Sequence, residues 1–196
     1  MLGTIVSINL CGRQRFFINV RLNSLVLKPS VPYHPMDKQP VMLPTYFNTS
    51  QNSKLELSMV NDTITAKKPI SFAFNMRQQP PIKEHTTLAA NVAIPITYPH
   101  VYYFEVQIID LDASGMVSIG LAPADRPLEG LPGWKNGSFG IHSDDGRVYY
   151  EDFQSGIMCT TPFGKGCTVG CGWDMRSKEL FFTVNGMSLG RSIVGL

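Results

Sequence analysis

Four carboxylates lie close together in the sequence and are the side chains best suited to chemistry. They are Asp144, Asp145, Glu151 and Asp152, with Tyr149 and Tyr150 between them. Paired carboxylates about 5–10 Å apart in a cleft can hydrolyse glycosidic bonds, and clusters of carboxylates can bind metal ions. A carbohydrate-binding or hydrolytic site is therefore one interpretation of this segment.

A structural role for the first two carboxylates is the favoured interpretation. Neighbouring residues of a strand point to opposite faces, so Asp144 and Asp145 converge only if they lie in a turn. Their position before Gly146 is typical of a turn in which carboxylates accept nearby backbone N–H groups. We therefore predict a turn at this position, with no metal ion and no catalytic acid–base pair.

The cysteines raise the alternatives of a disulfide, a zinc site and a nucleophile. They are Cys11, Cys159, Cys167 and Cys171. If Cys167 and Cys171 share one strand, roughly 13 Å separates them. That distance exceeds the limit of about 7 Å between the Cα atoms of a disulfide, and it excludes shared zinc ligation at about 2.3 Å. We predict buried free thiols in a reducing compartment, either cytoplasm or nucleus, and no cofactor.

The overall composition restricts the classes of partner. The chain has 196 residues, of which 43% are hydrophobic and 16% charged, as expected of a globular protein. A net charge of +2 gives no strongly basic face for nucleic acid. No apolar run approaches the roughly 20 residues that span a bilayer, so no membrane segment is predicted. The 17 glycines and 14 prolines favour many short strands over long helices.

The N-terminal part is predicted to be an irregular extension over residues 1–50. Residues 1–36 hold four basic side chains and no acidic one, which also occurs in mitochondrial presequences. However, Ile18 and Val20 alternate with polar residues, and this period is that of a strand. Five prolines in residues 29–46 indicate an extended linker, with an SH3 or WW ligand as the alternative.

The remainder of the chain shows the two-residue alternation of β-strands. Val101–Ile109 is the clearest case, with alternate side chains from Tyr102 to Ile108 all apolar. Further strands are predicted at Leu55–Met59, Thr63–Ala66, Met116–Leu121, Gly146–Tyr150, Thr168–Trp173 and Glu179–Val184. This number of short strands is typical of a β-sandwich.

Turns, loops and one short helix are expected between these strands. Asn185-Gly186 is the strongest hairpin signal, because both residue types tolerate positive φ. Residues 75–87 are polar and contain Pro80-Pro81, so they are predicted to form a loop. Thr86–Val92 is expected to form at most one or two helical turns.

Several separate motifs, in their order and spacing, resemble the SPRY family. They are Tyr102–Val106, Ser118–Leu121, Leu131–Trp134, His142–Gly146, Val169–Gly172 and Phe181–Gly186. The resemblance covers residues 53–196, which we expect to be the domain. The pair Leu-Pro-Gly-Trp and His-x-Asp-Asp-Gly is most similar to the Ran-binding protein M group. The resemblance implies an all-β sandwich of two antiparallel sheets that recognises other proteins without catalysing a reaction.

The resemblance also leaves two questions open. SPRY relatives usually continue beyond the Asn-Gly hairpin with further strands, whereas this sequence ends at Leu196. Either the last strands are missing, which would leave an unpaired sheet edge, or residues 1–30 fill the gap. In Ran-binding protein M relatives the module sits in ubiquitin-ligase assemblies, so a substrate-receptor or scaffold role is a second interpretation.

The residues that carry the resemblance are expected to frame the fold. Pro132 presets φ, and Gly133 permits a tight turn that folds Trp134 back onto a sheet, where its indole N–H needs an acceptor. The predicted fold signature is Leu131, Pro132, Gly133, Trp134, His142, Asp144, Asp145 and Gly146.

Partner binding is expected in loops at one end of the sandwich. By position alone these loops are Asp110–Gly115 and Pro123–Gly130. The second loop offers a charge, a rigid turn and an apolar group, which suit a small contact patch. The predicted contact residues are Asp112, Ser114, Arg126, Pro127 and Leu128. The expected partner is a protein or a short linear peptide, and nucleic acid is not expected.

Overall fold

Strands are the regular elements of the described part of the chain, and turns and loops connect them. The computed structural model describes residues 2–10, 15–21, 47–48, 56–60, 63–67, 84–90, 93–94, 101–111, 115–125, 130–135 and 137–193. Within these ranges there are fourteen strands and no helix. Accordingly, these residues contain no helix of the length and apolarity needed to span a membrane.

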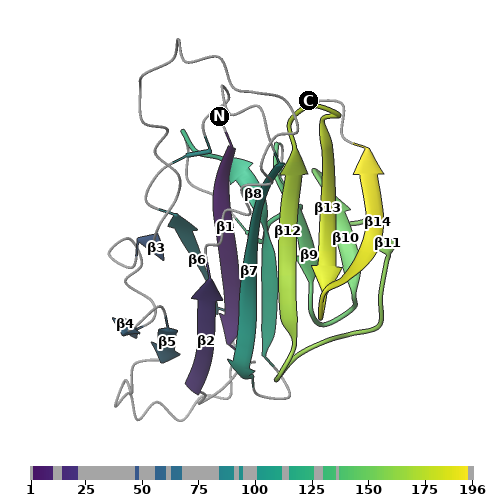
Figure 1. Ribbon diagram of the computed structural model, residues 1–196. Helices are drawn as coiled ribbons and strands as arrows, with labels where there is room; N and C mark the ends of the chain where they lie inside the picture. Colours follow the sequence, from purple (N-terminus) through teal and green to yellow (C-terminus); the bar gives the residue numbers. More distant parts are fainter. Residues whose placement is uncertain are drawn as a thin grey trace.

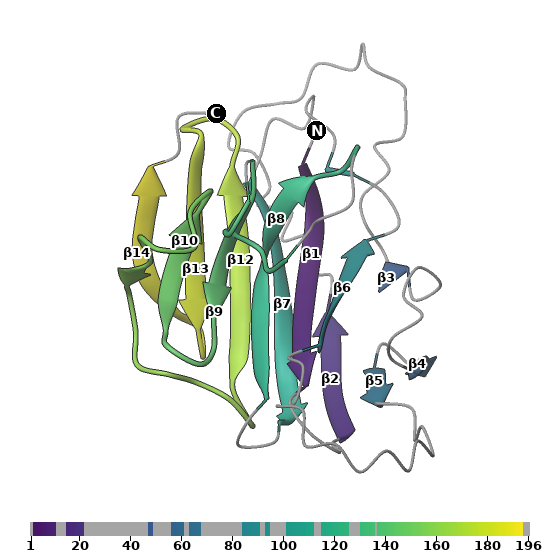
Figure 2. The ribbon, with the colours of Figure 1, turned by 180° about the vertical axis from the view of Figure 1, so that it is seen from behind.

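The strands form two seven-stranded antiparallel sheets that pack face to face (Figures 1 and 2). The first sheet has the order β11 (Ile157–Met158), β10 (Arg147–Tyr150), β9 (Phe139–His142), β8 (Met116–Pro123), β1 (Leu2–Leu10), β6 (Glu84–Ala90) and β3 (Phe47–Asn48). The second has the order β14 (Met187–Ile193), β13 (Glu179–Val184), β12 (Thr168–Asp174), β7 (Val101–Asp110), β2 (Arg15–Arg21), β5 (Thr63–Lys67) and β4 (Glu56–Val60). The terminal strands β11 and β14 lie at the same lateral edge of the sandwich in both views.

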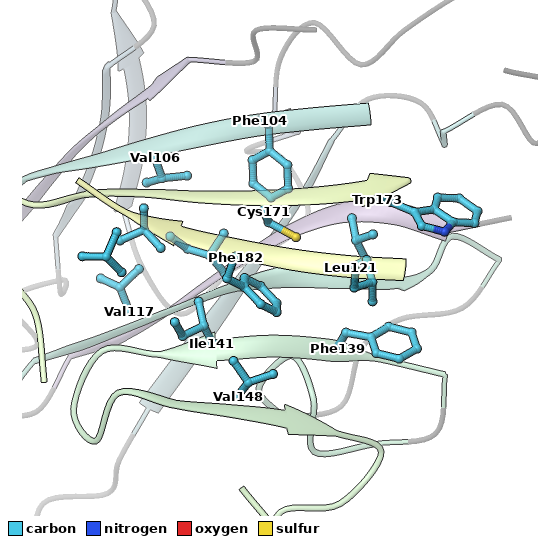
Figure 3. Packing of buried hydrophobic residues seen from close by; sticks show 14 of the residues in the cluster. Phe104, Val106, Val117, Leu121, Phe139, Ile141, Val148, Cys171, Trp173 and Phe182 are labelled. Atoms are coloured by element: carbon cyan, nitrogen blue, oxygen red, sulfur yellow. The ribbon is translucent and has the colours of Figure 1, made fainter. Parts of the chain in front are cut away.

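The core lies between the two sheets and follows from the alternation of the strands (Figure 3). In β7, every second side chain from Tyr102 to Ile108 is at most 2% exposed. Opposite them, β8 contributes Val117, Ile119 and Leu121, which are fully buried. Each buried aliphatic or aromatic side chain stabilises the fold by about 1.5–3 kcal/mol relative to an exposed one.

Most of the predicted strands are confirmed. The predicted strand Glu179–Val184 is β13, and the prediction Val101–Ile109 differs from β7 by one residue. Asn185 and Gly186 have φ values of 52° and 77°, so the hairpin prediction is also confirmed. The all-β class and the two antiparallel sheets agree with the expected sandwich.

The helix predicted at Thr86–Val92 is wrong. Glu84–Ala90 forms β6, which pairs with β1 and β3 in the first sheet. The predicted loop at residues 75–87 is also too long at its C-terminal end. A run of Thr, Leu and Ala has no decisive local preference, and the backbone of β1, about 80 residues away, supplies the pairing that selects a strand.

The N-terminal segment contributes strands to both sheets. β1 lies between β8 and β6, and β2 lies between β7 and β5. Residues 2–10 and 15–21 are therefore regular, although an irregular extension was predicted over residues 1–50. Their partners lie far away in sequence, so local patterning gave only the weak alternation at Ile18 and Val20. The alternative in which residues 1–30 supply strands agrees with this pairing.

Several expectations about the ends of the chain remain predictions. The proline-rich residues 29–46 lie outside the described part. The domain limits at residues 50 and 53 stay predictions, as does the absence of the last strands of the sandwich. β14, the last described strand, is a terminal strand of the second sheet.

Candidate functional site

The tight turn at Leu131–Trp134 is the starting point of the candidate site. The N–H of Trp134 donates to the carbonyl oxygen of Leu131 at 3.1 Å. Gly133 has a φ of 91°, a conformation that other residues rarely adopt. A Cβ at this position would also lie 2.5 Å from the Cβ of Tyr149. Glycine is therefore required here for two independent reasons, its backbone conformation and the close approach of β10.

This turn packs on the outer face of the first sheet and forms a second buried group there. We call it the outer cluster and define it as Pro132, Gly133, Trp134, His142 and Tyr149. The ring centroids of Trp134 and His142 are 5.6 Å apart, and those of His142 and Tyr149 are 4.4 Å apart. Their strand neighbours Ile141 and Val148 point into the core instead. The alternation of β9 and β10 thus supplies both the core and the outer cluster.

A hydrogen bond from His142 holds the outer cluster together. Its Nε2 lies 2.8 Å from the carbonyl oxygen of Pro132, which can only accept, so Nε2 carries the proton. His142 is 2% exposed, and this burial lowers the pKa of its imidazole. The imidazole is therefore neutral near pH 7 and serves as a donor that anchors the turn.

The indole of Trp134 differs from the expectation in one respect. Trp134 is half-buried, and its Nε1 is buried without a hydrogen-bond partner among the described residues. The sequence predicts an acceptor for this N–H, and the described residues supply none. The ring instead contributes apolar contact against His142.

The acidic turn predicted before Gly146 is present, and it supports the outer cluster. Asp145 accepts the backbone N–H of Arg147 through Oδ1 at 2.9 Å and the hydroxyl of Tyr149 through Oδ2 at 2.5 Å. Gly146 has a φ of 67°, and its N–H donates to the carbonyl oxygen of His142 at 3.0 Å. Burial, followed by the hydrogen bond to Asp145, raises the pKa of Tyr149 to about 12. The carboxylate of Asp145 therefore holds the neutral hydroxyl of Tyr149 in place.

The other two carboxylates of the acidic segment also bind neighbouring groups. Glu151 accepts the backbone N–H of Gly137 at 2.5 Å. Asp152 accepts the backbone N–H of Gln154 at 2.8 Å and the hydroxyl of Ser155 at 2.5 Å. Such bonds hold loops in place and do not pair two carboxylates for acid–base work. No group of three or more His, Cys, Asp or Glu in the described ranges is arranged to hold a metal ion.

Three of the cysteines lie in the described part, and all three are free thiols. Cys171 is fully buried in the core, and burial raises the pKa of its thiol. Burial also raises the pKa of the half-buried Cys159. Cys167 is half-buried and precedes β12. It therefore lies just outside the strand that holds Cys171, although one shared strand was predicted. Cys11 lies outside the described residues.

The predicted contact residues are not among those that the structure describes. Asp112 and Ser114 lie in one gap, and Arg126, Pro127 and Leu128 lie in another. In the sequence, the first two of these residues precede β8 and the other three follow it. The contact residues therefore stay a prediction.

The sequence reasoning missed a set of exposed apolar side chains. Phe153, Ile157 and Met158 are 61%, 68% and 58% exposed, respectively. They lie in and before β11, in an otherwise polar stretch between the acidic segment and Cys159. In the sequence, the only signal for this exposed set was a few apolar residues that do not alternate clearly with polar ones.

Comparison with known proteins identifies the family of the segment that contains the outer cluster. The family model of the SPRY domain matches residues 101–193. Residues 101–193 form a SPRY domain. The SPRY domain begins at β7 and contains every residue of the predicted fold signature. Strands β1 and β2 precede the matched segment, although they pair with β8 and β7.

Curated relatives of the SPRY domain come from several kinds of protein. Human SPRY domain-containing protein 3 is 35% identical over 100 residues, which cover 47% of this chain and 22% of that protein. Zebrafish (Danio rerio) Ran-binding protein 9 is 36% identical over 96 residues, covering 49% and 16% respectively. Dual specificity protein kinase splA of Dictyostelium discoideum is 44% identical over 92 residues, covering 45% and 4%. The chain thus spans less than a quarter of the length of these relatives.

Among solved structures, the chain is similar to a crystal structure of a human SPRY domain. The sequence identity is 33% and the TM-score is 0.45, with 48% of this chain and 61% of that chain covered. SPRY domains are generally protein-interaction modules without catalytic activity, as the sequence resemblance implied. The kinase name describes that relative, of which the match covers only a small part.

Proposed function

We propose that this chain is a non-catalytic module that binds a protein or a short linear peptide. The observation that carries the proposal is the SPRY domain at residues 101–193. The arrangement of the acidic segment supports it, because Asp145, Glu151 and Asp152 accept hydrogen bonds from neighbouring residues. A carbohydrate hydrolase would need two such carboxylates directed into one cleft.

The proposed contact surface centres on the loop that follows β8. Arg126, Pro127 and Leu128 lie between the end of β8 and the buried residue Leu131. The strand and the outer cluster are fixed by packing, and loops carried on a rigid scaffold are the usual place for recognition. Asp112 and Ser114, which precede β8 in the sequence, are proposed as further contact residues.

A peptide-display library and a pull-down with the whole chain would test this surface. We expect Arg126→Glu combined with Leu128→Asp to weaken the selected partner by at least about tenfold, the loss of about 1.4 kcal/mol of binding free energy. Arg176→Glu combined with Met187→Asp is the matched control, since both residues are exposed and lie elsewhere. Unchanged binding by the loop variant, or equal loss in the control, would contradict the assignment.

A finer form of the proposal places the chain in a ubiquitin-ligase assembly as substrate receptor or scaffold. The similarity to Ran-binding protein 9 supports this form, because the sequence motifs resemble the same group. Affinity purification of the tagged chain should recover ligase subunits in proportion to the bait. Their absence from purifications that do recover other partners would contradict this role.

We further propose a cytoplasmic or nuclear location. Three free thiols, one of them fully buried in the core, are typical of proteins kept in a reducing compartment. Fluorescence microscopy of the tagged chain should show signal in the cytoplasm or nucleus. Signal confined to the secretory pathway would contradict this proposal.

A further inference from the structure

The exposed edge of the first sheet at β11 is a second surface with unexplained features. β11 is the terminal strand of its sheet and pairs with β10 (Figures 1 and 2). Both of its residues, Ile157 and Met158, are more than half exposed, as is the nearby Phe153. Exposed apolar side chains along a sheet edge are an aggregation hazard unless another strand covers them.

The backbone of β11 also faces outward at one of its two residues. The N–H of Cys159 donates to the carbonyl oxygen of Gly146 at 3.2 Å, so this N–H points to the side of β10. Alternate residues of an antiparallel strand direct their peptide groups to opposite sides. By this alternation Met158, which pairs with Arg147, points its N–H and C=O away from β10, on the side where the described sheet ends. This is the arrangement that a further strand needs for pairing.

Negative charge is concentrated in the segment that contains this edge. Residues 137–160 hold four carboxylates and one basic side chain, although the whole chain has a net charge of +2. The exposed Asp144 lies in the turn that ends at Gly146. The carbonyl oxygen of Gly146 accepts the N–H groups of Cys159 and Thr160, which follow β11. The exposed Glu151 follows β10, and its carboxylate accepts the N–H of Gly137, which precedes β9. Arg147 directs its Nη1 to the carbonyl oxygen of Gly156 at 2.6 Å.

We propose that the β11 edge binds an extended peptide segment of alternating basic and apolar residues, which adds to the first sheet as a further strand. The outward peptide groups of Met158 supply main-chain hydrogen bonds, and the exposed side chains of Phe153 and Ile157 supply apolar contact. The exposed carboxylate of Asp144 and the excess negative charge of residues 137–160 attract basic side chains. Pairing with a second copy of this chain is disfavoured, because a symmetric contact would bring the same carboxylates together.

This inference goes beyond the loop surface proposed above, and the two are separable by experiment. The first probe is a short fluorescent peptide of alternating lysine and valine, and the second has glutamate in place of lysine. Fluorescence anisotropy with the whole chain should show the lysine peptide binding at least about tenfold more tightly than the glutamate peptide. N-methylation of the amides along one edge of the lysine peptide should also weaken binding about tenfold, because strand addition requires those groups.

Variants of the chain locate the binding at β11. Ile157→Ser combined with Met158→Ser should weaken the lysine peptide about tenfold, and Asp144→Asn should weaken it about threefold. Met187→Ser is the matched control, since Met187 is 69% exposed at the start of the other terminal strand β14. It should change binding less than twofold, as should Arg126→Glu in the loop surface.

Three results would overturn the inference. They are equal binding of the two peptides, equal loss in Met187→Ser, and a concentration-dependent dimer that Ile157→Ser with Met158→Ser abolishes in sedimentation velocity. The exposed positions at β11 make unfolding of this variant unexpected, and circular dichroism would check it. A failure here leaves the loop surface untouched, because that surface is tested with other variants and other peptides.

Discussion

His142 donates its Nε2 proton to the carbonyl oxygen of Pro132, and this bond joins β9 to the turn that precedes it. The two residues are ten positions apart in sequence, yet the bond lies within a buried cluster on the outer face of the sheet. The Leu-Pro-Gly-Trp and His-x-Asp-Asp-Gly motifs are therefore parts of one packed unit. Changes in either motif should act first on stability.

Acidification should destabilise the protein through His142. Burial lowers the pKa of its imidazole in the folded state, so below pH 6.5, the ordinary value, the unfolded state binds more protons. The contribution of His142 to the free energy of unfolding is therefore complete above pH 6.5 and is lost as the pH drops from there toward the lowered folded value. One proton contributes at most about 1.4 kcal/mol per pH unit.

Urea unfolding between neutral and mildly acidic pH would measure this effect. The variant His142→Gln keeps a donor for the carbonyl oxygen of Pro132 but does not titrate. Its free energy of unfolding should vary less with pH than that of the wild type. Parallel pH profiles for the two proteins would show that other groups cause the acid sensitivity.

Gly133→Ala should destabilise the protein more than Gly166→Ala. Both glycines have positive φ, at 91° and 85°, so each alanine carries a conformational cost of about 1–2 kcal/mol. Only the alanine at Gly133 also meets the Cβ of Tyr149 at 2.5 Å, whereas nothing lies within 4 Å at Gly166. Overpacking adds about 1–3 kcal/mol. Chemical denaturation should resolve this difference, and equal losses would mean that the turn moves freely away from β10.

Trp173→Ala should cost more stability than Trp134→Ala. Trp173 is 8% exposed and lies in the core, so its truncation should cost about 3–5 kcal/mol (Figure 3). Trp134 is half-buried against His142, so about half of that loss is expected. Urea unfolding of both variants would measure the losses. A fully stable Trp134→Ala protein that loses a partner would instead make Trp134 a contact residue.

Tyr149→Phe should remove a specific bond to the acidic turn. The hydroxyl donates to Oδ2 of Asp145 at 2.5 Å, and a hydrogen bond to a charged group contributes about 1.5–3 kcal/mol. The raised pKa of Tyr149, about 12, also means that the unfolded tyrosine ionises first, so stability falls as the pH rises above 10. Denaturation of the variant at neutral and high pH should show a lower stability at neutral pH and a weaker alkaline loss. A wild-type alkaline profile in the variant would exclude Tyr149 as the source.

The features that depend on a few neighbouring residues were predictable from the amino-acid sequence alone. The alternation in Val101–Asp110 decided which side chains enter the core, because successive side chains of a strand point to opposite faces. Asn185-Gly186 specified a hairpin, and Pro132-Gly133 specified a tight turn, since these residue types restrict or permit particular φ values. The order of these local motifs was enough to indicate the SPRY family.

The pairing of distant segments became known from the three-dimensional fold. Glu84–Ala90 becomes a strand because β1 and β3 flank it, and β1 and β2 enter the sheets beside β8 and β7. The strand order leaves β11 as a terminal strand of the sheet that the described residues form. Local residue patterns report conformation within a few residues, whereas strand pairing depends on backbone hydrogen bonds between segments far apart in sequence.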